Sequence, residues 1–210
     1  MPQASGFFNG NIRELRILMF MLKPQDILVT LKLMALAKRG QSWTYPGLAR
    51  DLVLSQSETH AAVSRALQSG LVGFDPWEKD GDRKPKPRMA DIVRFVVGGL
   101  KYMLPAEKGA PARGMPTSFA ASPLRNHLVV DGAPCPVWPG LPGESEGYTF
   151  VPIFRSCASA SLVDQDLYEL LTLADAIRDK ASNPRTQQLA SQEFELRCRV
   201  AANAAKSLVV

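Results

Sequence analysis

Proline is concentrated in one segment of this chain, and that segment limits where long helices can form. Nine of the 16 prolines fall between residues 105 and 152, with glycines between them. A proline inside a helix removes a backbone donor and clashes with the preceding turn. The segment nevertheless keeps large apolar side chains, including Trp138 and Phe150. We therefore expect residues 105–152 to form an ordered wrap over other elements, without long regular structure.

Helical patterns lie on both sides of the proline-rich segment. Apolar side chains recur there every three or four residues, the spacing that places them on one face of a helix. The pattern predicts helices over residues 11–22, 25–37, 89–104, 164–180 and 185–206. The fold is therefore expected to be mainly α.

Two short helices joined by a tight turn are predicted between residues 44 and 70. Thr44 is placed to cap the first helix. Ser55 is placed to cap the second, with Glu58 three residues later as its capping-box partner. The small side chain of Ala49 allows the two helices to cross closely. The apolar side chains expected to pack between them are Leu48, Leu52, Leu54, Val63 and Leu67.

The most informative stretch is residues 45–72, YPGLARDLVLSQSETHAAVSRALQSGLV. The residues used for comparison with known families are Leu48-Ala49, Leu52, Leu54-Ser55, Ser57, Val63-Ser64-Arg65-Ala66-Leu67 and Gly70-Leu71-Val72. In these residues it resembles the helix-turn-helix of winged-helix transcriptional regulators, of the broad kind that includes the MarR family. The resemblance covers about residues 25–88 and departs at Val53, where many such regulators have glycine in the turn. It implies a DNA-binding helix-turn-helix followed by a β-hairpin wing, so that the expected fold class is mainly α with a small β wing.

A polar outward face is expected on the second helix, about residues 55–69. Its side chains are short or planar hydrogen-bonding groups, without the Lys and Glu usual on an exposed helix. A helix that enters the major groove needs such groups near its N-terminal end, where they meet base edges and phosphates. The candidate DNA-binding residues of this recognition helix are Ser55, Gln56, Ser57, Thr59, His60, Ser64 and Arg65. Among them, Gln56 is expected to contact adenine, and Arg65 to bind phosphate or guanine.

The expected wing spans about residues 74–88 and is basic in its second half. Its candidate DNA-binding residues are Arg83, Lys84, Lys86 and Arg88. A basic hairpin beside a recognition helix suits contact with phosphates or the minor groove. An ordinary solvated loop is the alternative interpretation of this segment.

The positive charge of the chain lies in its first half. Residues 1–104 hold 15 Lys and Arg against 9 Asp and Glu, whereas residues 105–210 hold 10 against 11. A basic segment beside a near-neutral one is typical of a polyanion-binding module joined to another region. We therefore assign residues 1–104 to a winged helix-turn-helix domain with flanking helices. Residues 105–210 are assigned to the Pro/Gly-rich wrap and a C-terminal helical region for dimerisation or partner binding.

Neither catalysis nor metal binding has a sequence signature here. The three cysteines stand far apart, at Cys135, Cys157 and Cys198. This scatter argues against a disulfide framework and a zinc site, and it favours a reducing, cytoplasmic setting. The apolar run over residues 17–22 is too short to span a bilayer. We expect no enzyme activity, cofactor, metal or membrane association.

Several functions stay open. The first is a transcriptional regulator on double-stranded DNA, acting as a homodimer because one winged helix buries little groove surface. The second is an interaction module such as an antitoxin, whose winged helix autoregulates its operon while the C-terminal helices hold a protein partner. A winged helix used only for protein contacts, and an enzyme, are the remaining alternatives.

Overall fold

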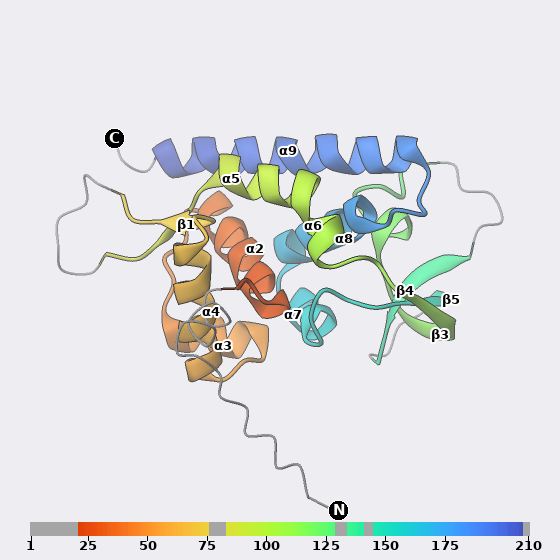
Figure 1. The fold of residues 1–210 in the computed structure, drawn as a ribbon, viewed down its shortest axis with the longest axis horizontal. Helices are drawn as coiled ribbons and strands as arrows, with labels where there is room; N and C mark the ends of the chain where they lie inside the picture. The colour runs from red at the N-terminus through yellow and green to blue at the C-terminus, as the bar shows by residue number, and fades with distance from the viewer. Residues whose placement is uncertain (1–20, 76–82, 129–133, 141–144, 208–210) are drawn as a thin grey trace, which may run out of the picture.

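The computed structural model describes residues 21–75, 83–128, 134–140 and 145–207. In this part of the chain the protein is mainly helical, with two small sheets. The helix expected over residues 11–22 falls, up to residue 20, outside the described residues. Figure 1 shows the short helices α3 and α4 and strand β1 toward one end of the molecule, and β3, β4 and β5 toward the other.

The first described elements are three helices followed by a two-stranded antiparallel hairpin. They are α2 (Pro24–Lys38), α3 (Tyr45–Leu52), α4 (Gln56–Gln68), β1 (Val72–Gly73) and β2 (Lys86–Pro87). Both caps expected from the sequence are confirmed. Thr44 Oγ1 accepts a hydrogen bond from Gly47 N at 3.1 Å. Ser55 Oγ accepts one from Glu58 N at 3.1 Å, and the Glu58 carboxylate accepts one from Ser55 N at 2.9 Å.

A helical rod follows the hairpin, as the sequence predicts for residues 89–104. It consists of α5 (Met89–Val93), the π-helical segment η1 (Arg94–Gly99) and α6 (Leu100–Met103). The π-helical segment was not expected. It ends on Gly98 and Gly99, where the helix is intrinsically weakest because glycine has low helix propensity.

Three strands form a small closed sheet within the proline-rich segment. They are β3 (Lys108–Pro116), β4 (Cys135–Pro139) and β5 (Ser145–Phe150), with β3 antiparallel to both others and β4 parallel to β5. The expectation that residues 105–152 lack long regular structure is therefore wrong for β3. This strand changes partner along its length, pairing with β5 up to Gly114 and with β4 from Gly114 onward. At Pro111 the strand pairs with β5, and its pairing with β4 begins only at Gly114. A proline is tolerated in a strand where the backbone donor on one side is not needed.

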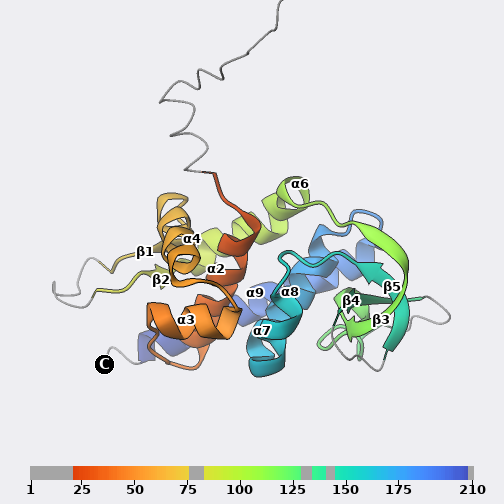
Figure 2. The same ribbon diagram turned by 90° about the horizontal axis from the view of Figure 1, so that it is seen from below.

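Three helices complete the described chain. They are α7 (Cys157–Val163), α8 (Gln165–Arg178) and α9 (Pro184–Ser207). The helices expected over residues 164–180 and 185–206 are confirmed, whereas α7 was not expected. Figures 1 and 2 show the long α9 extending along the molecule, with α5 and α2 beneath it in the first view.

Helix α2 is the centre of the hydrophobic core. Its side chains from Asp26 to Leu36 are all buried, and it packs against α3 and α4 as well as α8 and α9. Leu28 of α2, Leu171 of α8 and Phe194 of α9 belong to one cluster of buried apolar side chains. The segments 1–104 and 105–210 therefore share a core around α2.

A network of ion pairs also joins the two segments. We call it the charge clamp, and its members are Lys32, Lys38 and Arg39 of the α2 region, Asp51 of α3, and Asp164 and Asp166 at the start of α8. Lys32 Nζ lies 3.0 Å from an Asp51 carboxylate oxygen and 2.8 Å from one of Asp164. Burial opposes ionisation of Asp164, but hydrogen bonds from Arg39 and Lys32 prevail and lower its pKa to about 2. Asp164 also caps α8, as its Oδ1 accepts from Leu167 N at 3.1 Å.

Candidate nucleic-acid interface

Helix α4 presents a polar face to solvent. Its inner residues Ala62, Val63 and Ala66 are buried, and the helix packs against α2, α3 and β1. The exposed side chains are Gln56, Ser57, His60, Ser64 and Gln68. They follow the spacing of one helical face, as expected from the sequence, with Gln68 as an additional member.

Arg65 does not lie on this face, and the expectation that it contacts DNA is wrong. Its side chain is buried against α2, where Nε lies 2.7 Å from Asp26 Oδ2 and Nη2 lies 2.6 Å from Asp26 Oδ1. Asp26 is completely buried and also accepts a hydrogen bond from Lys23 N at 2.8 Å. The buried carboxylate requires a cationic partner, so the guanidinium is held inside the protein.

Thr59 is the second correction to the expected contact set. Its side chain is buried, and its hydroxyl donates to the Ser55 carbonyl oxygen at 2.9 Å. A threonine in this position bonds back to its own helix and cannot reach a base edge. Thr59 therefore supports the start of α4 from the inside.

Ser55 is exposed, but its polar atoms take part in the cap of α4. Its hydroxyl lies 2.8 Å from a Glu58 carboxylate oxygen and 3.2 Å from the Ser57 hydroxyl. Hydrogen bonds from the Ser55 backbone and then its side chain lower the pKa of Glu58, and Arg155 adds to the effect. The N-terminal end of α4 thus carries a negative charge that a nearby cation opposes.

His60 is held in place by an aromatic contact that sequence reasoning did not find. Its ring stacks on Tyr45 of α3, with centroids 3.6 Å apart and planes at 14°. Trp43 meets Tyr45 edge to face, with centroids at 5.2 Å. An exposed histidine would otherwise sample several rotamers, and the stack restricts the directions in which its ring nitrogens point.

The turn between α3 and α4 forms in spite of the valine at its centre. Val53 adopts the left-handed conformation, with φ 53° and ψ 48°, and its side chain is 59% exposed. A β-branched residue is strained in this region, which glycine occupies freely. The tight turn therefore forms without the glycine that many winged-helix regulators have there, at some energetic cost.

The hairpin brings basic side chains close to the end of α4. Lys86 and Arg88 are exposed, and Arg83 and Lys84 are half-buried. Lys86 Nζ lies 3.8 Å from an Asp75 carboxylate oxygen, and Arg83 Nη2 donates to the Asp75 carbonyl at 2.6 Å. The expected tip of the wing, residues 76–82, lies outside the described residues.

Arg88 lies directly over the first hairpin strand. A Cβ atom added at Gly73 would stand 2.3 Å from Arg88 Nε, so any larger residue there would displace the Arg88 guanidinium. The backbone N–H of Arg88 donates to the Leu71 carbonyl at 2.9 Å, and Leu71 N donates to the Ala66 carbonyl of α4 at 3.0 Å. These bonds fix the base of the hairpin relative to α4.

Arg155 is a candidate interface residue that sequence reasoning missed. It precedes α7, its side chain is 76% exposed, and its Nη2 lies 3.9 Å from Glu58 Oε1 at the start of α4. Nothing in the local sequence connects Arg155 with Glu58, because the fold alone brings these distant positions together.

The described residues offer little that suggests another kind of site. They hold no group of His, Cys, Asp and Glu suited to a metal ion, and none of their helices is long and apolar enough to cross a membrane. Burial raises the pKa of the Cys157 thiol to about 12, so this thiol is protonated at neutral pH. Reactive cysteines require the opposite shift.

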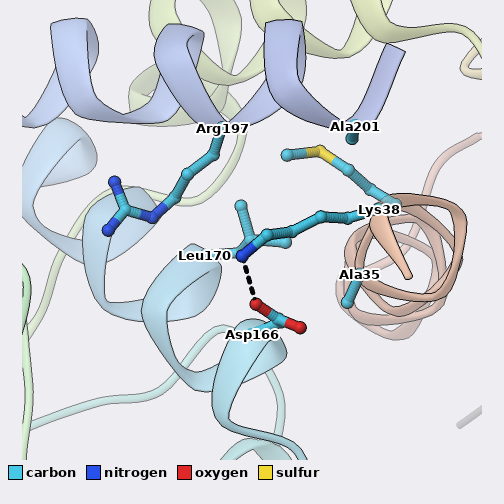
Figure 3. A pocket seen from close by; sticks show the side chains of 7 residues that line it. Ala35, Lys38, Asp166, Leu170, Arg197 and Ala201 are labelled. Carbon is cyan, nitrogen blue, oxygen red and sulfur yellow. Dashed lines mark hydrogen bonds and ion pairs between the residues drawn. The ribbon is translucent and has the colours of Figure 1, made fainter. Parts of the chain in front are cut away.

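Two surface hollows can be described. The first lies between α2, α8 and α9 and is lined by Met34, Ala35, Lys38, Asp166, Leu170, Arg197 and Ala201 (Figure 3). Its volume of about 10 Å³ is near the minimum for one water molecule. A wider, open hollow of about 510 Å³ is lined by Leu22, Ser69, Gly70, Leu71, Arg88, Asp91, Arg94 and Phe95.

Protein-family models, curated proteins and solved structures give no significant match to this chain.

Proposed function

We propose that the protein is a winged helix-turn-helix transcriptional regulator that binds double-stranded DNA. Helix α4 would enter the major groove, and the β1–β2 hairpin would act as the wing. The observation that carries this proposal is the exposed polar face of α4, which stands beside a basic hairpin anchored to the same helix. Major-groove recognition needs both base-reading groups and adjacent phosphate contacts.

The chemistry of the α4 face supports base contacts. Gln56 can pair with adenine through its amide, and Ser57 and Ser64 can donate to or accept from base edges and phosphates. His60 offers a ring nitrogen in an orientation restricted by Tyr45. These four side chains and the basic residues of the hairpin are the proposed contacts. Of the set expected from the sequence, Thr59 and Arg65 are buried and Ser55 takes part in the cap of α4.

The proposal includes action as a homodimer. A single recognition helix and wing cover few base pairs, and two-fold symmetric sites are the common way to reach high affinity. A palindromic binding site would be its signature in DNA.

Selection of bound sequences from a random duplex library tests both parts. We expect one enriched motif with two-fold symmetry. The double variant Ser57→Glu/Ser64→Glu places two carboxylates on the α4 face and should weaken binding at least tenfold, by about 1.4 kcal/mol or more. Gln188→Glu/Gln192→Glu is the matched control, because it also adds two carboxylates and both glutamines are exposed on α9, which packs against α2, α5 and α8.

Two results would contradict the proposal. One is the absence of any duplex binding by the folded wild-type protein at moderate salt. The other is equal loss of binding in the α4 variant and the α9 control, because an effect that depends only on added charge would not identify α4 as the contact surface.

A further inference from the structure

The segment between β5 and α7, residues 151–156, brings one cation from the C-terminal half to the start of α4. Arg155 stands in this segment, 3.9 Å from Glu58 at its nearest nitrogen. Its guanidinium also lies 5.5 Å from the centre of the Phe154 ring. The side chain of Arg155 is 76% exposed and that of Glu58 is 38% exposed.

The position of this segment is fixed by hydrogen bonds near both of its ends. Val151 N donates to the Glu107 carbonyl at 3.0 Å, and the Val151 carbonyl accepts from the Arg178 guanidinium. Phe154 N donates to the buried Cys157 sulfur at 3.3 Å. Beyond α7, the charge clamp ties the start of α8 to α2 and α3. The backbone that carries Arg155 therefore keeps a defined place beside α4.

The ion pair between Arg155 and Glu58 is weak enough to leave the cation available. Exposed pairs of this kind contribute little, because water screens both charges. Glu58 is committed to the cap of α4 through Ser55, so its carboxylate stays where a phosphate would approach. A cation at the same place both offsets that carboxylate and can bind the phosphate.

We propose that Arg155 is a phosphate contact of the bound duplex, so that the C-terminal half forms part of the DNA interface. This inference rests on the proposed function above. It adds to α4 and the hairpin a third contact at the N-terminal end of α4, and the residue that makes it lies outside the helix-turn-helix segment.

The test measures duplex affinity of Arg155→Ala over a range of salt concentrations. Loss of one phosphate contact should reduce the slope of log affinity against log salt by about 0.9. Affinity should fall by roughly fivefold at ~50 mM salt, with less effect at ~200 mM and the same factor for different sequences. Arg155→Lys should keep most of the slope, since lysine also binds phosphate as a point charge.

Two controls separate a phosphate contact from a general effect of charge and from neutralisation of Glu58. Arg113→Ala removes an equally exposed arginine, paired with Glu146 at 2.7 Å on the small sheet, and should leave affinity and slope unchanged. The second control repeats Arg155→Ala in a Glu58→Gln background, because glutamine retains the capping box but carries no charge. If Arg155 binds phosphate directly, its removal still weakens binding there.

Each contrary result is distinct. An effect that disappears in the Glu58→Gln background would show that Arg155 only neutralises Glu58, which overturns the phosphate contact. Unchanged affinity and slope in Arg155→Ala, with a wild-type protein that binds DNA, would overturn this inference and leave the proposed function intact. A wild-type protein that binds no duplex would refute both.

Discussion

Replacement of Arg65 by alanine should lower the stability of the folded protein, and it should not remove a DNA contact. The change would leave Asp26 completely buried in α2 without the two hydrogen bonds of 2.7 and 2.6 Å that Arg65 supplies. Breaking one partner of a buried ion pair costs about 3–5 kcal/mol. For a protein of this length each kcal/mol of lost unfolding free energy lowers the melting temperature by about 2–4 °C. We therefore expect the melting temperature of the variant to fall by roughly 6–20 °C.

The assay is thermal unfolding followed by circular dichroism, combined with duplex binding measured well below the melting transition. The double variant Asp26→Leu/Arg65→Met should recover most of the stability, because an apolar pair of similar size avoids the cost of burying charge. A small deficit of about 1 kcal/mol should remain, since Lys23 N loses its hydrogen bond to Asp26.

The reasoning would be refuted by a folded Arg65→Ala protein whose melting temperature falls by less than about 2 °C while its DNA affinity collapses. That pattern would return Arg65 to the interface and would mean that the pair with Asp26 opens when DNA binds.

Two further predictions concern the turn and the charge clamp. Val53→Asn should stabilise the protein by about 1 kcal/mol, because asparagine tolerates the left-handed conformation better than valine. The control is Val151→Asn, at an exposed position without positive φ. Equal stabilisation by both changes would show that backbone strain at Val53 is not the cause. Because the folded pKa of Asp164 is lowered from 3.8 to about 2, its contribution of about 2 kcal/mol is present above pH 4 and lost as pH falls toward 2. Asp164→Asn should therefore flatten the dependence of unfolding free energy on pH in that window. Urea denaturation at a series of pH values measures this dependence, and the same decrease toward low pH in the variant and the wild type would contradict the prediction.

Local sequence was sufficient to predict the helix ends of the candidate site. The caps at Thr44 and Ser55 involve partners three residues away, so the sequence alone contains all that decides them. Helices α8 and α9 were likewise predictable from the spacing of their apolar residues. Interactions of this short range depend little on the rest of the fold.

The direction of individual side chains on α4 was harder to predict. Arg65 was expected to contact DNA as part of the recognition helix. Its partner Asp26 lies 39 residues earlier in the chain, so the local pattern did not reveal the buried pair. Strand β3 was missed because proline counts do not reveal which side of a strand lacks a partner. Arg155 was missed because its proximity to Glu58 depends on how α7 and α3 pack together.

The central position of α2 has a consequence for any signal that the protein receives. This helix packs against α3 and α4 as well as against α8 and α9. Lys32 of α2 forms ion pairs with Asp51 of α3 and with Asp164 at the start of α8. A ligand or partner that shifted α8 would therefore also displace α3 and α4, whose surface is proposed to contact DNA. Such a displacement needs no separate hinge, because α2 contacts both groups of helices.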